Sequence, residues 1–66
     1  MDIVLNGEPR AVRAELSLAA LLDELGLAGK RLAVEVNRDI VPRGEHATRM
    51  LRAGDRVEII HAIGGG

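Results

Sequence analysis

The segment Ser17-Leu18-Ala19-Ala20-Leu21-Leu22-Asp23-Glu24-Leu25-Gly26 carries the clearest structural signal in this chain. Its leucines, at positions 18, 21, 22 and 25, recur at the spacing of one helix face. The serine that opens the segment is a favoured N-cap, and the glycine that closes it is favoured just after a helix. Leu16 and Leu21 fit a hydrophobic staple. The pattern predicts one helix over about Leu18 to Leu25, with its leucine face on a sheet.

The chain before this helix has the pattern of a β-hairpin. Asp2 to Asn6 alternates apolar and polar residues, as a strand does. Asn6-Gly7 is a strong signal for a type I′ turn. We expect the return strand over Arg10 to Ala14, with Pro9 at its start, where a missing N–H does least harm.

After the helix, two further strands and an irregular crossover are expected. Arg31 to Val36 alternates, and Asn37-Arg38-Asp39 turns the chain into Ile40-Val41-Pro42. No period is sustained from Arg43 to Arg52. The last strand covers Arg56 to Ala62, with Val57 and Ile59 inward and Ile60 and Ala62 on the opposite face.

The element order is therefore ββαββ, and one helix on one face of a mixed sheet is its economical packing. We predict an α+β fold of the β-grasp (ubiquitin-like) type, with four to five strands and the first and last strands side by side at the sheet centre. Residues 1–63 would form the domain and residues 64–66 a flexible tail. The expected core comprises Ile3, Leu5, Val12, Leu18, Leu21, Leu22, Leu25, Leu32, Val34, Val36, Leu51, Val57 and Ile59, closed by Met50 and Leu51.

Composition excludes several classes of protein. The 66 residues contain no cysteine, so neither a disulfide nor a thiolate metal site is available. The net charge of −1 and the lack of aromatic residues argue against nucleic-acid binding. No apolar run could cross a bilayer, and no signal segment is visible. We expect a cytoplasmic protein that is a monomer when free.

Side chains suited to catalysis are sparse. His46 and His61 lie in different segments without a cysteine or a matching carboxylate, so we expect no catalytic residue, no metal site and no bound cofactor. His46 is expected to be a solvated or capping loop residue, and His61 to be structural or part of a docking surface. The carboxylates of Asp23 and Glu24 should be solvated. A further candidate is a cluster of positive charge that could bind an acidic partner, formed by Arg43, Arg49, Arg52 and Arg56. Acidic residues between them reduce its net positive charge.

The chain ends Ala62-Ile63-Gly64-Gly65-Gly66 directly after the last predicted strand. Without side chains, three glycines can thread a narrow channel and reach about 10 Å. The carboxylate of Gly66 is ionised at neutral pH and requires activation, for example by ATP-dependent adenylation. A frayed terminus is the alternative interpretation.

Apolar residues on the sheet face away from the helix could dock a partner beside this tail. Val4, Ile60 and Ala62 share that face by alternation, and Ile63 follows them.

Several stretches resemble the ThiS family of small β-grasp sulfur carriers. They are Leu5-Asn6-Gly7-Glu8, Val34-Glu35-Val36-Asn37, Ile40-Val41-Pro42-Arg43, Gly54-Asp55-Arg56-Val57-Glu58-Ile59 and the terminal Gly-Gly. The resemblance spans nearly the whole chain, and the Val-Asn to Val-Pro-Arg segment is its most specific part. The family often has a bulkier apolar residue where this chain has Ala62, and Gly64 is a variable position.

The resemblance implies a carrier rather than an enzyme. Gly66 would be adenylated by a ThiF-type enzyme that uses ATP, and would become a thiocarboxylate with sulfur derived from a cysteine desulfurase. A ThiG-type thiazole synthase would accept that sulfur for thiamin biosynthesis. Three alternatives stay open: the small subunit of molybdopterin synthase, a ubiquitin-like protein modifier, and a plain binding module without tail chemistry.

Overall fold

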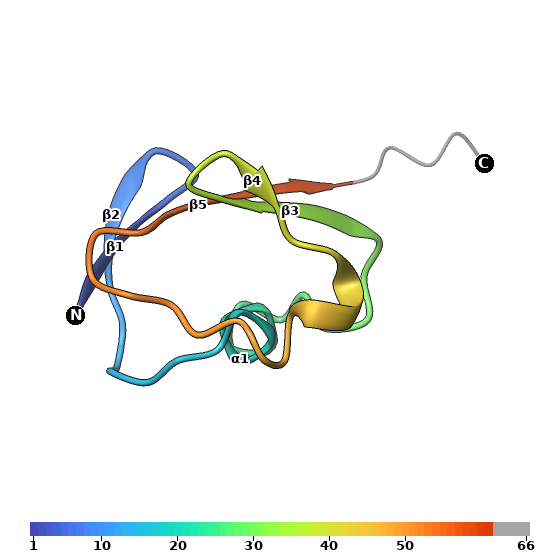
Figure 1. Ribbon diagram of the computed structural model, residues 1–66, viewed down its shortest axis with the longest axis horizontal. Helices are drawn as coiled ribbons and strands as arrows, with labels where there is room; N and C mark the ends of the chain where they lie inside the picture. Colours follow the sequence, from blue (N-terminus) through green and yellow to red (C-terminus); the bar gives the residue numbers. More distant parts are fainter. Residues whose placement is uncertain (62–66) are drawn as a thin grey trace.

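The computed structural model describes residues 1–61, which form one mixed sheet with one α-helix beneath it (Figure 1). The elements in chain order are β1 (Asp2–Leu5), β2 (Glu8–Ala11), α1 (Leu18–Glu24), β3 (Leu32–Val36), β4 (Asp39–Ile40), the 3₁₀ helix η1 (Arg43–Glu45) and β5 (Arg56–His61). Within these residues no helix is long and apolar enough to cross a membrane.

The five strands are ordered β2-β1-β5-β3-β4, so the last strand lies in the middle of the sheet. β1 and β5 run parallel, whereas β1–β2, β3–β4 and β3–β5 are antiparallel. In Figure 1 the sheet runs across the top, with α1 and the crossover both below it. This is the predicted β-grasp arrangement, with the first and last strands adjacent.

Both hairpins of the sheet turn on two residues with positive φ, as a type I′ turn requires. Asn6 and Gly7 have φ of 49° and 82°, which confirms the predicted first turn. Because the loop has only two residues, β2 begins at Glu8 rather than at Arg10, and Pro9 lies opposite Val4 inside an edge strand. An edge strand tolerates proline because one side of it has no partner.

The start of α1 is held by its own N-cap and by the crossover. Ser17 Oγ accepts a hydrogen bond from the Ala20 N–H at 3.0 Å, as predicted for an N-cap. The N–H groups of Leu18 and Ala19, which have no partner inside the helix, donate to the carbonyls of Arg49 and His46 at 2.9 Å each. The free N–H groups at the helix N-terminus therefore find their hydrogen-bond acceptors in a segment that comes much later in the chain.

The helix α1 ends just before Gly26, as the sequence predicted. The helix ends at Glu24 with Leu25 as its C-cap, one residue earlier than predicted, and Gly26 follows with φ of 75°. Such a left-handed glycine is a common helix terminator. Glu24 is exposed and pairs with Arg13 at 3.0 Å, while Asp23 is also exposed, as expected for the polar side of the helix.

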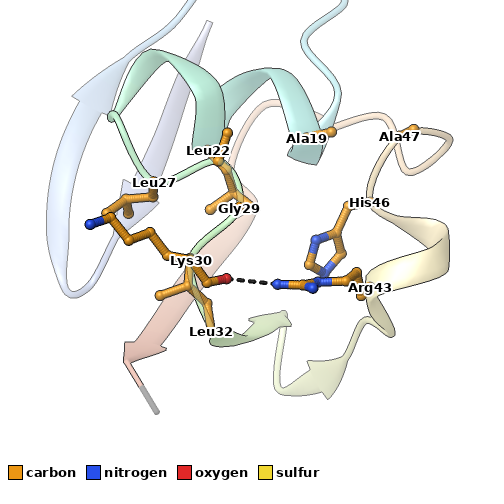
Figure 2. A pocket seen from close by; sticks show the side chains of 10 residues that line it. Ala19, Leu22, Leu27, Gly29, Lys30, Leu32, Arg43, His46 and Ala47 are labelled. Atoms are coloured by element: carbon orange, nitrogen blue, oxygen red, sulfur yellow. Dashed lines mark hydrogen bonds between the residues drawn. The ribbon is translucent and has the colours of Figure 1, made fainter. Parts of the chain in front are cut away.

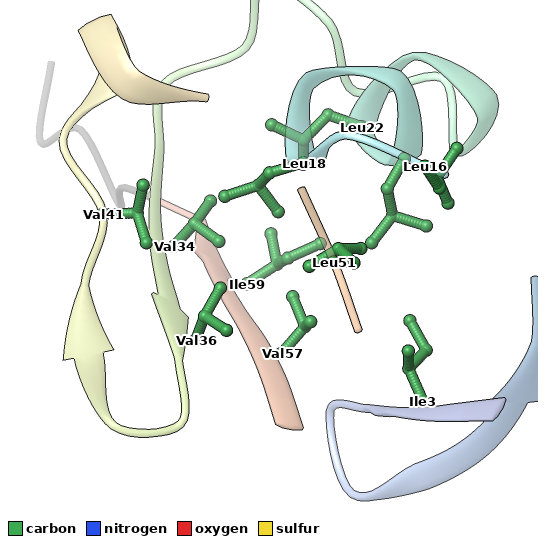
Figure 3. Packing of buried hydrophobic residues seen from close by; sticks show 11 residues of the cluster. Ile3, Leu16, Leu18, Leu22, Val34, Val36, Val41, Leu51, Val57 and Ile59 are labelled. Carbon is green, nitrogen blue, oxygen red and sulfur yellow. The ribbon is translucent and has the colours of Figure 1, made fainter. Parts of the chain in front are cut away.

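The hydrophobic core lies between α1 and the inner face of the sheet (Figure 3). Leu16 and Val41 belong to it although they were not in the predicted core. The expectation that Met50 closes the core is wrong: its side chain is 45% exposed, whereas Leu51 is buried. Leu51 N–H donates to the Leu16 carbonyl beside the Ser17–Met50 bridge, and strand-like alternation there turns Leu51 inward and Met50 outward. The predicted core residues Leu5, Val12, Leu25 and Leu32 are only partly buried.

Candidate functional site

The end of β5 is the part of the described chain that lies closest in sequence to the glycine tail. β5 ends at His61, which pairs with Leu32 of β3, and Ile60 pairs with Ala33. Strand structure thus continues almost to the glycines, as predicted. The remaining candidates of the tail, Ala62, Ile63 and Gly64 to Gly66, lie outside the described residues.

Asn6 supports the middle of β5, a role that the turn signal alone did not indicate. Its N–H donates to the Val57 carbonyl, and its side-chain Oδ1 accepts from the Ile59 N–H, each at 2.8 Å. The side chain therefore adds one more hydrogen bond to the β1–β5 ladder after β1 has ended at Leu5. Within the sequence, the only hint of this was that asparagine, unlike glycine, carries an amide that can bond to a nearby backbone.

A second asparagine anchors the start of β5. Asn37 Oδ1 accepts from the Arg56 N–H at 2.9 Å, and its amide nitrogen donates to Asp55 Oδ1 at 3.0 Å. The other oxygen of Asp55, which is a buried residue, accepts from the Arg52 N–H at 2.8 Å. Since both hairpin turns bond to β5 in this way, the strand that leads to the tail is held at its start and in its middle.

The open face of the sheet carries two of the predicted partner-binding residues, but it separates them. Val4 is half-buried and Ile60 is 49% exposed. Val4 pairs with Arg56 at the start of β5, whereas Ile60 lies near the end of that strand. Arg56 and Glu58 occupy the same face between them, because alternate residues of a strand share a face. The predicted apolar patch is therefore interrupted by charge, and only Ile60 lies near the end of the strand.

Like charges meet on this face beside Ile60. Glu35 of β3 is directly opposite Glu58 of β5, and Ile40 of β4 is opposite Glu35. Ile40 is the most exposed large apolar residue of the described chain, at 72%. Facing carboxylates on neighbouring strands are unfavourable in the free protein. The surface around Ile60 thus combines apolar side chains with two carboxylates.

The other candidates prove structural or scattered. The expectation of a solvated His46 side chain is wrong: it is buried, and Nε2 is 3.0 Å from the Val41 carbonyl. The reason is that η1, an element the sequence did not reveal, directs this side chain inward, while the His46 carbonyl caps α1. His61 is exposed. In residues 1–61 no three His, Cys, Asp or Glu side chains are grouped to hold a metal.

The four arginines of the candidate cluster line three different depressions. Arg49 and Arg52 line one depression with Asn37 and Asp55, whereas Arg43 and Arg56 each line a different one.

Comparison with known proteins identifies the family. The ThiS family model matches residues 3–66. The sulfur carrier protein ThiS of Thermus thermophilus is 39% identical over 62 residues, which cover 94% of this chain and 95% of that protein. A crystal structure of the thiamine biosynthesis protein ThiS from Geobacter metallireducens superposes with a TM-score of 0.87 at 30% identity and covers 100% of both chains.

A longer relative contains a similar segment. The thiazole synthase of Paramagnetospirillum magneticum is 44% identical over all 66 residues, and this chain spans only 20% of its length. Together these matches confirm the predicted β-grasp fold and the resemblance to the ThiS family. The chain belongs to the ThiS family.

Proposed function

We propose that the α-carboxylate of Gly66 is the sulfur-carrying group of this protein. The observation that carries the proposal is the position of the glycines: they follow a strand that occupies the centre of the sheet and is anchored by Asn6 and Asn37. An extended chain gains roughly 3.3 Å per residue. The stretch from Ala62 to Gly66 is therefore long enough to present Gly66 in a partner's active site while the domain stays on the partner's surface.

The chemistry begins with activation by a ThiF-type adenylyltransferase. A carboxylate oxygen attacks the α-phosphorus of ATP, pyrophosphate leaves, and Gly66 becomes a mixed anhydride with AMP. A cysteine desulfurase provides the sulfur as a persulfide, and a thiol reductant releases it as hydrosulfide while forming a disulfide. The hydrosulfide then attacks the carbonyl carbon. The C–S bond forms as the C–O bond to AMP breaks, and a thiocarboxylate remains. The absence of Cβ at Gly65 and Gly66 leaves this carbonyl unhindered.

The proposed acceptor of the sulfur is a ThiG-type thiazole synthase. Support comes from the thiazole synthase of P. magneticum, because a segment similar to this chain is part of that protein. Ile60 and the neighbouring open face form the proposed docking surface for both enzymes, and Val4, Ala62 and Ile63 are the further candidates. Gly64 and Gly65 serve as the narrow part of the tail.

The proposal predicts that the carrier tolerates no change at its end. Deleting Gly66, or adding one alanine after it, should abolish ATP-dependent adenylation and sulfur loading, because the reacting carboxylate is removed or displaced. The melting temperature should stay unchanged, because the described core extends only to Ile59. Intact mass spectrometry after incubation with a ThiF-type enzyme and ATP measures the adenylate, and thermal melting of the same samples is the control. Normal adenylation of the extended chain would contradict the proposal.

A further inference from the structure

A pocket of about 240 Å³ lies on the helix side of the sheet, away from the open face (Figure 2). Its walls come from α1, the segment that links α1 to β3, the first residue of β3, and the chain at and after η1. Leu22, Leu27 and Leu32 supply apolar surface, while Arg43 and His46 supply polar atoms. An enclosed apolar cavity of about 150 Å³ can hold benzene. The volume of this pocket is therefore sufficient for a ring with a substituent.

Arg43 is held in place at one side of the pocket. Its guanidinium donates to the Lys30 carbonyl at 2.8 Å, a contact that Figure 2 shows as a dashed line. One nitrogen is therefore committed to the protein, and the other N–H groups of the fork form no hydrogen bond to the described residues. A guanidinium fixed in this way suits a carboxylate, because its remaining donors match the two carboxylate oxygens.

His46 places a second polar atom in the pocket wall. His46 is only 8% exposed. Its Nε2 lies 3.0 Å from the Val41 carbonyl, which can only accept a hydrogen bond. Nε2 therefore donates, and in the neutral ring Nδ1 is an acceptor. No buried side-chain nitrogen of the described residues lacks a partner. Nδ1 forms no hydrogen bond within the described residues, so it is not fully buried. Because His46 lines the pocket, a ligand donor there could reach Nδ1.

We propose that this pocket binds a small carboxylic acid whose apolar body is the size of one ring and carries a hydroxyl or N–H group. The carboxylate would bond to Arg43, the body would lie on Leu22, Leu27 and Leu32, and the hydroxyl or N–H would donate to His46 Nδ1. Lys30 adds positive charge at the rim. This chemistry is separate from the sulfur chemistry proposed for Gly66, and its test uses no partner enzyme.

The pocket adjoins the strand that leads to the tail. Leu32, one of its wall residues, is the register partner of His61, the last residue of β5. A ligand in the pocket would therefore lie beside the end of β5, on the sheet face opposite Ile60. A bound acid is in a position to influence how the end of β5 is presented to a partner.

Three kinds of probe separate the contributions. Benzoate supplies the ring and the acid, benzyl alcohol supplies the ring without the charge, and acetate supplies the charge without the ring. For a ligand of this size we expect a benzoate Kd of about 1 mM. Amide chemical shifts in two-dimensional NMR should move for residues 27–32 and 43–47, and both partial probes should bind at least about tenfold more weakly. At least one of the three hydroxybenzoate isomers should bind more tightly than benzoate.

Variants of the full chain locate the site. Arg43→Gln should weaken benzoate binding by about tenfold or more, since a charge-assisted hydrogen bond is lost. Arg49→Gln is the matched control, because Arg49 lines a different depression and its loss should leave the affinity unchanged. Ala19→Leu should also abolish binding by filling the pocket from α1. Thermal melting shows that each variant is folded.

Four results would overturn the proposal. One is equal affinity for benzoate and benzyl alcohol, and another is undiminished binding to folded Arg43→Gln. The third is a set of shifts spread over the sheet, and the fourth is no shift for any acid at concentrations tenfold above the expected Kd. If benzoate binds at the pocket but no hydroxybenzoate gains affinity, the assigned role of His46 is wrong.

Discussion

Ile60 and Met50 have similar exposure but different surroundings. Ile60 is 49% exposed and lies on the open face of the sheet, one residue before the end of β5, whereas Met50 is 45% exposed on the crossover beside Arg49 and Arg52. Single apolar residues on a surface are normal. Position rather than exposure therefore makes Ile60 the candidate for contact with a partner that receives the tail.

We expect Ile60→Asp to weaken the complexes with both the ThiF-type and the ThiG-type enzyme by about tenfold or more. A carboxylate at the centre of an interface replaces an apolar contact and adds to the negative charge of Glu35 and Glu58. The side chain is already half in water, so the melting temperature should fall by only a few degrees. Isothermal titration calorimetry measures the affinities.

Met50→Asp is the control for this experiment, because it introduces the same charge at a residue of similar exposure on another surface. It should leave both affinities unchanged. If Ile60→Asp lowers the melting temperature strongly and leaves binding intact, Ile60 belongs to the core and the assignment to a docking surface is wrong.

At the scale of elements, the two hairpins form the same type of turn with different residues. Asn6-Gly7 and Asn37-Arg38 are both two-residue turns with positive φ at both positions. Glycine adopts this conformation without steric cost, whereas a residue with Cβ loses roughly 1 to 2 kcal/mol. Arg38, with φ of 70°, therefore carries strain that Gly7 avoids.

Arg38→Gly should raise the free energy of unfolding by about 0.5 kcal/mol, because the relief of strain exceeds the extra chain entropy of glycine. Gly7→Ala should lower it by about 1 kcal/mol for the opposite reason. Urea unfolding of the two variants and the parent chain measures both changes. A loss of stability in Arg38→Gly would show that the arginine side chain contributes more than its backbone costs.

At the scale of the whole molecule, the sheet places the segments that resemble ThiS beside the strand that leads to the tail. Residues 34–43 form most of β3, all of β4 and the start of η1, and β3 pairs with β5 along its whole length. Discrimination between partners requires unfavourable contacts with the wrong one as well as good contacts with the right one. The paired carboxylates Glu35 and Glu58 are suited to both tasks.

The thiocarboxylate form should therefore support thiazole formation with a ThiG-type synthase and fail with the large subunit of molybdopterin synthase. Complementation of the respective carrier-deletion strains measures this choice, and immunoblots of the strains compare expression. Restoration of molybdopterin synthesis without growth in the absence of thiamin would contradict the proposed pathway. A ladder of larger conjugates on these blots would favour a protein modifier instead.

Local signals were sufficient for much of this fold. The leucine spacing, Ser17 and Gly26 act within one or two helical turns, and the Asn6-Gly7 turn acts within one hairpin. Alternation along β5 likewise placed Val57 and Ile59 inside and Ile60 outside. Each of these patterns depends on neighbours in the chain, so the residues themselves are enough to predict the helix, the first turn and the faces of the last strand.

Contacts between distant segments decided the rest. His46 is buried because the crossover folds over the start of α1, and Asn6 bonds to Ile59 from the opposite end of the sequence. Val4 and Ile60 share a face by alternation, yet only the register of β1 against β5 sets the distance between them. The pocket beside Arg43 also requires three separate segments to meet. Periodicity describes one element at a time, whereas these features depend on how the elements pack against each other.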